Sequence, residues 1–184
     1  MGRPPNPKAK SDLLRRAAGY VLEHGLIGLS LRPLAAAIGV SPRLLLYHFG
    51  SKEQLIIEVL SDIASQQHTA LGNLDSSADP ETRFDLLWAA LSSPQLTPFM
   101  RTLFEVELRA MEGDPQYRQF ASGVIQAWIA LVADSLEGVP KPTANFVLST
   151  LSGLLIDRFA TGDTARTDKA FAAFKKMLKA GAVL

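Results

Sequence analysis

The sequence SLRPLAAAIGVSPRLLLYHFGSKEQL, from Ser30 to Leu55, decides the fold. Ser30 can accept a backbone N–H as the N-cap of a first helix, and Gly39 supplies the conformation that ends such a helix. Ser41 can cap a second helix in which Pro42 takes the first position, where its missing N–H and fixed φ suit the helix. The stretch therefore predicts two helices separated by a tight turn.

The second of these helices is predicted to be very short and to be followed at once by a longer one. Gly50 closes it after Phe49, and Ser51 to Gln54 have the form of a capping box that opens the next helix. Apolar residues then recur at spacings of three and four, as in an amphipathic helix: Leu55, Ile56, Val59, Leu60 and Ile63. The short helix, 42–49, is thus held between two neighbours, a layout that can place one helix in a DNA groove.

The rest of the chain also has helical patterns. No run alternates with period two for long enough to indicate a sheet, so the predicted fold class is all-α. A polar, turn-rich segment at 72–80 separates an N-terminal domain, 1–74, from a larger second domain, 75–184. About nine helices are expected, near 8–24, 30–38, 42–49, 51–71, 79–91, 99–111, 115–136, 143–160 and 164–180.

The composition fits a protein with a real hydrophobic core. The chain has 184 residues, of which 47% are hydrophobic, and it has no cysteine, which excludes disulfides, thiolate zinc sites and a cysteine nucleophile. No apolar run approaches the roughly 18 residues that a membrane span requires, and nothing resembling a signal peptide precedes the first helix. We therefore expect a cytoplasmic protein without a membrane anchor.

The net charge of +1 hides an asymmetry along the chain. Residues 1–52 carry eight Lys or Arg against two acidic residues, Asp12 and Glu23, whereas residues 53–184 carry 11 basic and 16 acidic residues. A basic end on a mildly acidic chain indicates that a polyanion binds at one end only, with Arg3, Lys8 and Lys10 as a basic arm. The alternative is a solvated charged tail.

The sequence offers no constellation for catalysis. His24, His48 and His68 lie far apart on different predicted faces, without the partners of a metal site. Gly28-Leu29-Ser30 begins like a nucleophile elbow, but Arg32 stands where the closing glycine should be, and no strand precedes it. A P-loop and a GxGxxG motif are both missing. We therefore expect no enzyme, no metal and no cofactor.

The run YHFGSKEQL, from Tyr47 to Leu55, with Gly39 to Ser41 before it, closely resembles the TetR family of bacterial transcriptional regulators. The resemblance covers the first four helices, and Leu151 to Asp163 with the final helix also resembles the end of that family's regulatory domain. It implies four DNA-binding helices, an effector-binding core and a dimer formed by the last two helices. One departure is Leu46, where many members have an aromatic residue, so we expect an altered set of DNA contacts.

The physical reading also places helix 42–49 in the major groove. Its N-terminus presents free N–H groups and a positive dipole end, which suit a phosphate. The fork of Arg43 can bond guanine O6 and N7 together, or it can contact a phosphate. Tyr47 and His48 can donate to phosphate oxygens, although the YHF run can equally serve to pack this helix on the next, with Phe49 in the core.

Lys52 adds a further anion contact. A cation in the first turn of a helix opposes the helix dipole, so an external anion explains this lysine better than local stability does. The resemblance likewise implies a DNA phosphate for the matching lysine. The full set of expected DNA contacts is Ser30, Arg32, Ser41, Pro42, Arg43, Leu44, Tyr47, His48 and Lys52.

The second domain carries large, adaptable side chains on consecutive helices. Such a set can line an apolar pocket for a small molecule, or it can simply fill the core. Glu105, Glu107 and Arg109 alternate along one of these helices, so one or two can point inward and orient a polar group of a ligand. The expected contacts to an unknown, largely apolar effector are Trp88, Phe99, Phe104, Glu105, Met111 and Trp128.

The last two helices have apolar faces that predict a four-helix interface about a two-fold axis. The residues expected in it are Val147, Leu151, Leu154, Leu155, Phe171, Phe174, Met177 and Leu178. A monomer in which these helices pack internally is the alternative.

Together these features predict a homodimeric, ligand-responsive regulator that represses transcription from an inverted-repeat operator in double-stranded DNA. In a dimer, two recognition helices should reach successive major grooves about 34 to 36 Å apart. The competing hypothesis is a helical protein–protein interaction module whose basic end only keeps it soluble.

Overall fold

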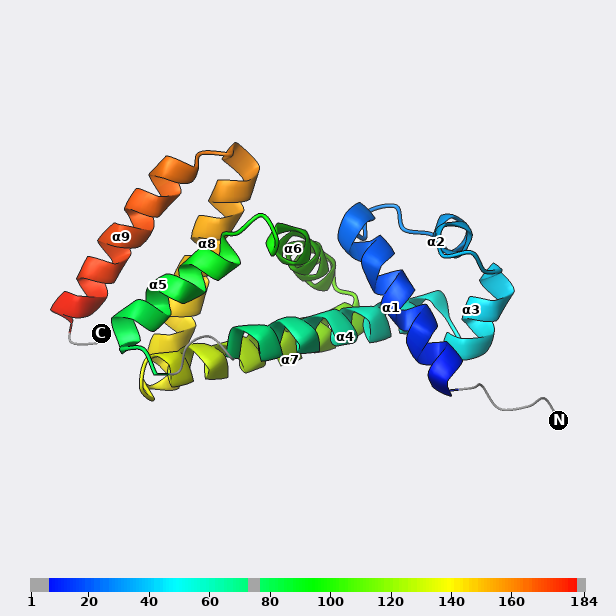
Figure 1. Ribbon diagram of the computed structural model, residues 1–184, viewed down its shortest axis with the longest axis horizontal. Coiled ribbons are helices and arrows are strands. Elements are labelled where there is room, and N and C mark those ends of the chain that lie inside the picture. The colour runs from blue at the N-terminus through cyan, green and yellow to red at the C-terminus, as the bar shows by residue number, and fades with distance from the viewer. Residues whose placement is uncertain (1–6, 73–76, 182–184) are drawn as a thin grey trace. The chain divides into compact units, whose positions relative to one another are not determined.

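A computed structural model describes residues 7–72 and 77–181, and all regular structure in these ranges is helical (Figure 1). The first four helices are α1 (Pro7–His24), α2 (Leu31–Ala37), α3 (Pro42–Phe49) and α4 (Lys52–Gly72). They are followed by α5 (Pro80–Leu91), α6 (Thr97–Met111), α7 (Pro115–Ser135), α8 (Lys141–Thr161) and α9 (Thr164–Ala180). The predicted all-α fold and number of helices are confirmed for the described residues.

Capping chemistry sets most of the helix ends. The hydroxyl of Ser41 accepts the backbone N–H of Leu44 at 3.2 Å, and the carboxylate of Asp79 accepts that of Thr82 at 3.0 Å. Gly50, with φ +81°, ends α3 as predicted. The prediction for Ser30 is half wrong: it holds the N-cap position of α2 with extended φ and ψ, but its side chain makes no capping hydrogen bond.

The described residues form two compact units, and neither is continuous in the sequence. The first unit comprises residues 7–67 and 98–122, that is, α1 to α3, most of α4, α6 and the start of α7. Within it, α2 packs directly on α1 and α3. Each of its helices supplies buried apolar side chains: Leu13, Ala17, Val21, Leu34, Leu45, Phe49, Leu55, Val59, Leu103, Val106 and Tyr117.

The second unit comprises residues 68–72, 77–97 and 123–181, which include α5, most of α7, α8 and α9. Its core is aromatic where α5 meets α9, because the rings of Trp88 and Phe171 stack with centroids 4.8 Å apart and Phe84 lies 5.1 Å from Phe171. The helices α8 and α9 pack directly on one another. Along the described residues, none of the helices is long and apolar enough to cross a membrane.

Candidate nucleic-acid interface

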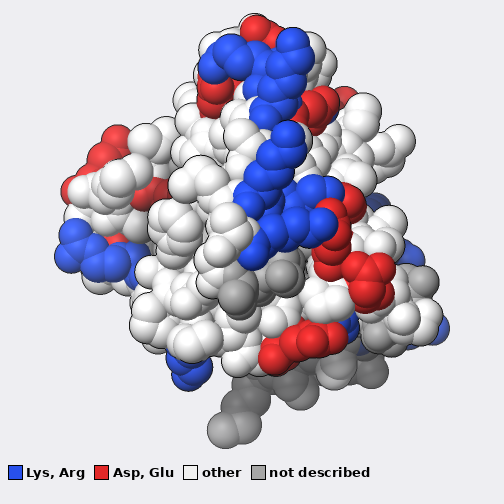
Figure 2. Space-filling view, turned by 90° about the vertical axis from the view of Figure 1, so that its left-hand side faces the viewer, with Lys and Arg blue, Asp and Glu red and all other residues white. Residues whose placement is uncertain are grey.

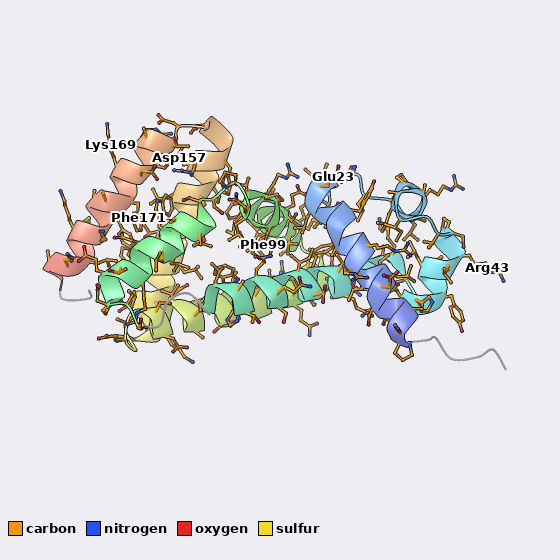
Figure 3. All side chains as sticks on the ribbon, viewed as in Figure 1. Glu23, Arg43, Phe99, Asp157, Lys169 and Phe171 are labelled. Carbon is orange, nitrogen blue, oxygen red and sulfur yellow. The ribbon has the colours of Figure 1, made fainter. Side chains whose placement is uncertain are left out.

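The helix α3 divides cleanly into an inner and an outer face. Leu45 and Phe49, one turn apart, are 0% and 4% exposed and fix the helix to its unit. Arg43, Leu44 and Tyr47 lie on the other side and are exposed. The inner face therefore aims the predicted contact residues at solvent, and in Figure 3 Arg43 projects from α3 away from the neighbouring helices of its unit.

The outer face of α3 is unusually apolar for a surface. Leu44, Leu46 and Tyr47 are 38%, 40% and 50% exposed, and all three follow Arg43 within four residues. Leu46, the departure from the family pattern, thus shares the exposed face. An apolar patch beside an arginine suits a surface that meets base edges, where thymine methyl groups offer apolar contact.

His48 can present only one of its ring nitrogens to a ligand. Its Nδ1 is buried and has no hydrogen-bond partner, and its ring lies edge-on to Tyr47 with centroids 5.2 Å apart. Any contact to DNA must therefore use Nε2. The ring of Phe49, 6.5 Å away, is in the core as predicted.

Lys52 has an acceptor within the chain that the sequence did not suggest. Its Nζ lies 3.4 Å from the backbone oxygen of Leu29, immediately before Ser30. Half of the predicted capping box is present at the start of α4, where the hydroxyl of Ser51 accepts the N–H of Gln54 at 3.0 Å. The amide of Gln54 donates instead to Glu58.

Two further predicted contacts lie at the start of α2. Ser30 and Arg32 are both exposed, and because the hydroxyl of Ser30 caps nothing, it is available to an outside partner. In the described part of the chain, Arg32 and Arg43 form no ion pair.

The basic arm is only partly testable. Arg3 lies outside the described residues. Lys10 has partners within the chain: its Nζ pairs with Glu58 at 2.7 Å and sits 5.0 Å from the centroid of the Phe49 ring. This lysine ties α1 to α3 and α4, because its two partners, Phe49 and Glu58, lie on those helices.

The residues expected around an effector divide between the two compact units. Trp88 and Trp128 belong to the second unit and are buried, while Phe99 is buried in the first. Phe104 is half-buried, and Met111, at 71% exposed, is at the surface. The indole N–H of Trp88 is already used, since it donates to Asp168 at 3.1 Å.

Glu105, which is predicted to orient an effector, has hydrogen-bond partners within the chain. Its carboxylate accepts the backbone N–H groups of Leu26 and Ile27, in the loop between α1 and α2. Glu107 is different: it is half-buried, and burial raises its pKa above the usual glutamate value. Of the acidic pair on α6, Glu107 is the better candidate to face a ligand.

Six of the eight residues predicted for a dimer interface are buried within their own chain. Val147, Leu151, Leu155, Phe171, Phe174 and Leu178 are each 6% exposed or less. Within one chain these six side chains therefore offer little surface to a second copy. Leu154 is half-buried and Met177 is 68% exposed, so these two are still accessible.

The accessible apolar residues of α8 lie on a different face from the predicted one. Phe146 and Ile156 are 56% and 49% exposed, with exposed Gly153 between them at helical spacing. The sequence pattern correctly shows that these helices are amphipathic. Their more apolar faces are buried within the chain, where α8 packs on α9, and the less apolar faces lie at the surface.

Comparisons with known proteins agree with this geometry. A family model described as bacterial regulatory proteins, tetR family, matches residues 13–59. The HTH-type transcriptional regulator BetI of Rhizobium meliloti (strain 1021) is 26% identical over 130 residues, which cover 70% of this chain and 53% of BetI. The chain thus spans about half the length of that relative.

Solved structures share the fold over nearly the whole chain. A transcriptional regulator from Saccharomonospora viridis, in complex with choline, superposes with a TM-score of 0.74 at 18% identity and covers 95% of this chain and 97% of its own. The multidrug binding protein EbrR, complexed with proflavin, gives 0.72 at 19% identity, with 95% and 99% covered. The matched segment 13–59 contains the capped helix pair and the start of α4 described above. Over residues 13–59 the chain therefore matches the tetR family of bacterial regulatory proteins, and α2 and α3, its helix-turn-helix, lie within this match.

Proposed function

We propose that the protein binds an inverted-repeat operator as a homodimer and represses transcription until a small effector releases it. The observation that carries the proposal is the outer face of α3, where Arg43, Leu44 and Tyr47 are exposed and the helix N-terminus is capped by Ser41. Arg43 reads a base, Leu44 and Pro42 contact the groove, and Tyr47 donates to a phosphate.

Additional phosphate contacts surround this helix. The backbone N–H groups at Ser41 face a phosphate, and the Nε2 of His48 donates to another. Ser30 and Arg32 contact the backbone at the start of α2. Lys52 exchanges the Leu29 oxygen, 3.4 Å away in the free protein, for a phosphate, since a charged acceptor forms the stronger hydrogen bond.

The second copy packs against the exposed faces of α8 and α9. Phe146, Gly153 and Ile156 on α8 and Met177 on α9 form its apolar centre. Basic side chains run along the face seen in Figure 2, and Lys169 points outward from α9 in Figure 3. Because like charges repel across a two-fold axis, the axis lies closer to α8, and the lysines belong to the rim.

Selection from random double-stranded DNA tests this function. We expect the protein to enrich a palindrome with half-sites about one helical turn apart, and its affinity for that DNA to fall steeply as salt rises. The competing hypothesis, a helical interaction module without specific DNA binding, predicts no enriched sequence. A weak salt dependence would favour that hypothesis as well.

The effector is proposed to be a largely apolar molecule that carries a positive charge. Glu107 supports this, because a half-buried carboxylate whose pKa is raised by burial is stabilised by a cationic ligand. On the helix it shares a face with Met100 and Leu103, which are buried and apolar. The fold relatives solved with choline and with proflavin, both cations, are consistent with this ligand class.

Replacing Glu107 with glutamine should weaken cation binding and stabilise the fold. Proflavin, followed by its fluorescence, should bind the variant roughly tenfold less tightly, because a charge-assisted contact is lost. Since the pKa of Glu107 is raised in the folded state, its deprotonation costs stability as pH rises through that pKa. The melting temperature of E107Q should therefore exceed that of the wild type at neutral pH, and the two should converge below the ordinary glutamate pKa.

Glu112→Gln is the matched control, because Glu112 is exposed just after α6 and its loss changes the charge equally. Equal proflavin affinity in the wild type and E107Q would contradict the assignment of a cationic effector to Glu107.

A further inference from the structure

Three side chains of α6 reach the same short segment of the DNA-binding helices. Arg101, Glu105 and Arg109 are spaced by four residues, so they lie along one face of the helix. Glu105 accepts the N–H groups of Leu26 and Ile27 through a single oxygen, Oε2, which is 3.2 Å from the Ile27 nitrogen. Two consecutive amides that converge on one carboxylate oxygen form a small anion-binding concavity.

The two arginines hold the backbone oxygens that flank this concavity. Nη2 of Arg101 lies 3.3 Å from the oxygen of Glu23, in the last turn of α1, where a cation complements the helix dipole. Nη2 of Arg109 lies 3.3 Å from the oxygen of Leu26, and its guanidinium sits 5.6 Å from the ring centroid of Tyr117. Arg109 is therefore itself held in place from the α7 side.

Gly25 shows that the fit is close. A Cβ at this position would lie 2.7 Å from Oε1 of Glu105, nearer than such atoms approach, and the φ of Gly25 is +75°. The turn favours glycine because of its positive φ, and a side chain here would have to displace the carboxylate of Glu105. The loop that follows α1 is shaped around this one side chain.

The same loop leads directly into the helix-turn-helix. Three residues lie between Leu26 and Ser30, the N-cap of α2, and Lys52, at the start of α4, donates to the backbone oxygen of one of them, Leu29. In the free protein, the segment is consequently held near its beginning by α6 and near its end by Lys52 of α4. All of these residues belong to the first compact unit.

We propose that Glu105 is a positioning residue for DNA binding: it sets the conformation of the α1–α2 loop and thereby the placement of α2 and α3 for the operator. The proposal rests on the proposed function. Without the carboxylate, the amides of Leu26 and Ile27 lose their shared acceptor and the loop samples several conformations. Only molecules whose loop has the DNA-binding conformation can bind, so the apparent affinity falls in proportion to their fraction.

Affinity measurements on Glu105→Ala and Glu105→Gln test the proposal, with DNA enriched by the wild-type protein as the probe. We expect E105A to bind about tenfold or more weakly at a temperature where it is fully folded. We expect E105Q to recover much of the loss, because its amide oxygen can still accept both N–H groups. Glu112→Gln should bind at least as tightly as the wild type.

Electrostatics make this comparison sharp. Removing a carboxylate makes the protein more positive, which by itself strengthens DNA binding. A loss of affinity in E105A therefore runs against the change in charge and must come from geometry. E105A that binds as tightly as E112Q would overturn the proposal, whereas a wild-type protein that enriches no DNA would overturn the proposed function instead.

Amide hydrogen exchange separates positioning from general stability. In E105A, the amides of Leu26 and Ile27 should exchange about tenfold faster or more, while those in the middle of α4 keep their wild-type rates. Uniformly faster exchange over α1 to α4 would indicate a merely structural role. Unchanged exchange at both loop amides would also reject the proposal.

A double-mutant cycle with Gly25→Ala tests the proposed close fit. The φ of +75° makes G25A unfavourable in any background, but the clash with the carboxylate is present only when Glu105 is. G25A should therefore lower the melting temperature less in E105A than in the wild-type chain. Equal shifts in both backgrounds would show that the carboxylate does not shape the loop.

Discussion

Replacing Arg43 with alanine should weaken binding to the selected operator by roughly 10- to 100-fold and relax sequence preference at one base position of each half-site. The reason is that Arg43 is exposed on the outer face of α3 and forms no ion pair within the described chain, so its donors are available to a base. Affinity should be measured for the selected sequence and for single-base variants of it.

Lys52→Met distinguishes a base contact from a phosphate contact. It should weaken binding nearly equally for all sequences. It should also lower the slope of log affinity against log salt concentration by about one, because one phosphate contact is lost. Arg118→Ala is the charge-matched control, because Arg118 is exposed on α7. If R43A behaves as K52M does, with no change in preference at any position, Arg43 contacts a phosphate and does not read a base.

Replacing Ile156 with glutamate should produce a folded monomer that no longer binds the palindrome tightly. Ile156 is 49% exposed in the single chain, so a charge there is tolerated in the monomer. In a two-fold interface the residue occurs twice, and an unpaired buried charge at about 2 kcal/mol per copy raises the dimer dissociation constant by roughly 1000-fold.

Sedimentation velocity over a wide range of concentration measures this change, and circular dichroism verifies that the variant is folded. Gln126→Glu, an exposed site on α7, is the control for an added carboxylate. A dimer that persists in I156E would place the interface elsewhere, and a wild-type protein that is monomeric at all concentrations would remove the dimer from the proposed function.

Local chemistry explains why the helix boundaries could be predicted. A cap such as Ser41, a proline such as Pro42 and a left-handed glycine such as Gly50 act within one turn of the chain, so the sequence alone contains both partners of the interaction. The start and end of α3 follow from them. Ser30 is the exception, because a serine can occupy the cap position without forming the bond.

Roles that depend on distant partners were beyond the sequence. Glu105 bonds to residues 78 and 79 positions away, and nothing in its own helix indicates that a loop amide is its partner. Similarly, the spacing of Val147, Leu151 and Leu155 shows that they share a face but not whether α9 or a second molecule covers it. The recognition helix could be located because its cap, Ser41, and its terminal Gly50 lie next to it in the sequence.

The discontinuity of the first compact unit limits how this protein can be divided. Its helices before residue 67 hold α6 through the loop contacts of Glu105 and Arg109, so a fragment cut after residue 74 discards part of its own tertiary structure. No single truncation therefore yields only the DNA-binding helices and α6, because the segment 68–97 lies between them in the chain. A shortened protein that retains them needs a linker across residues 68–97, so that α6 returns to its place beside α1.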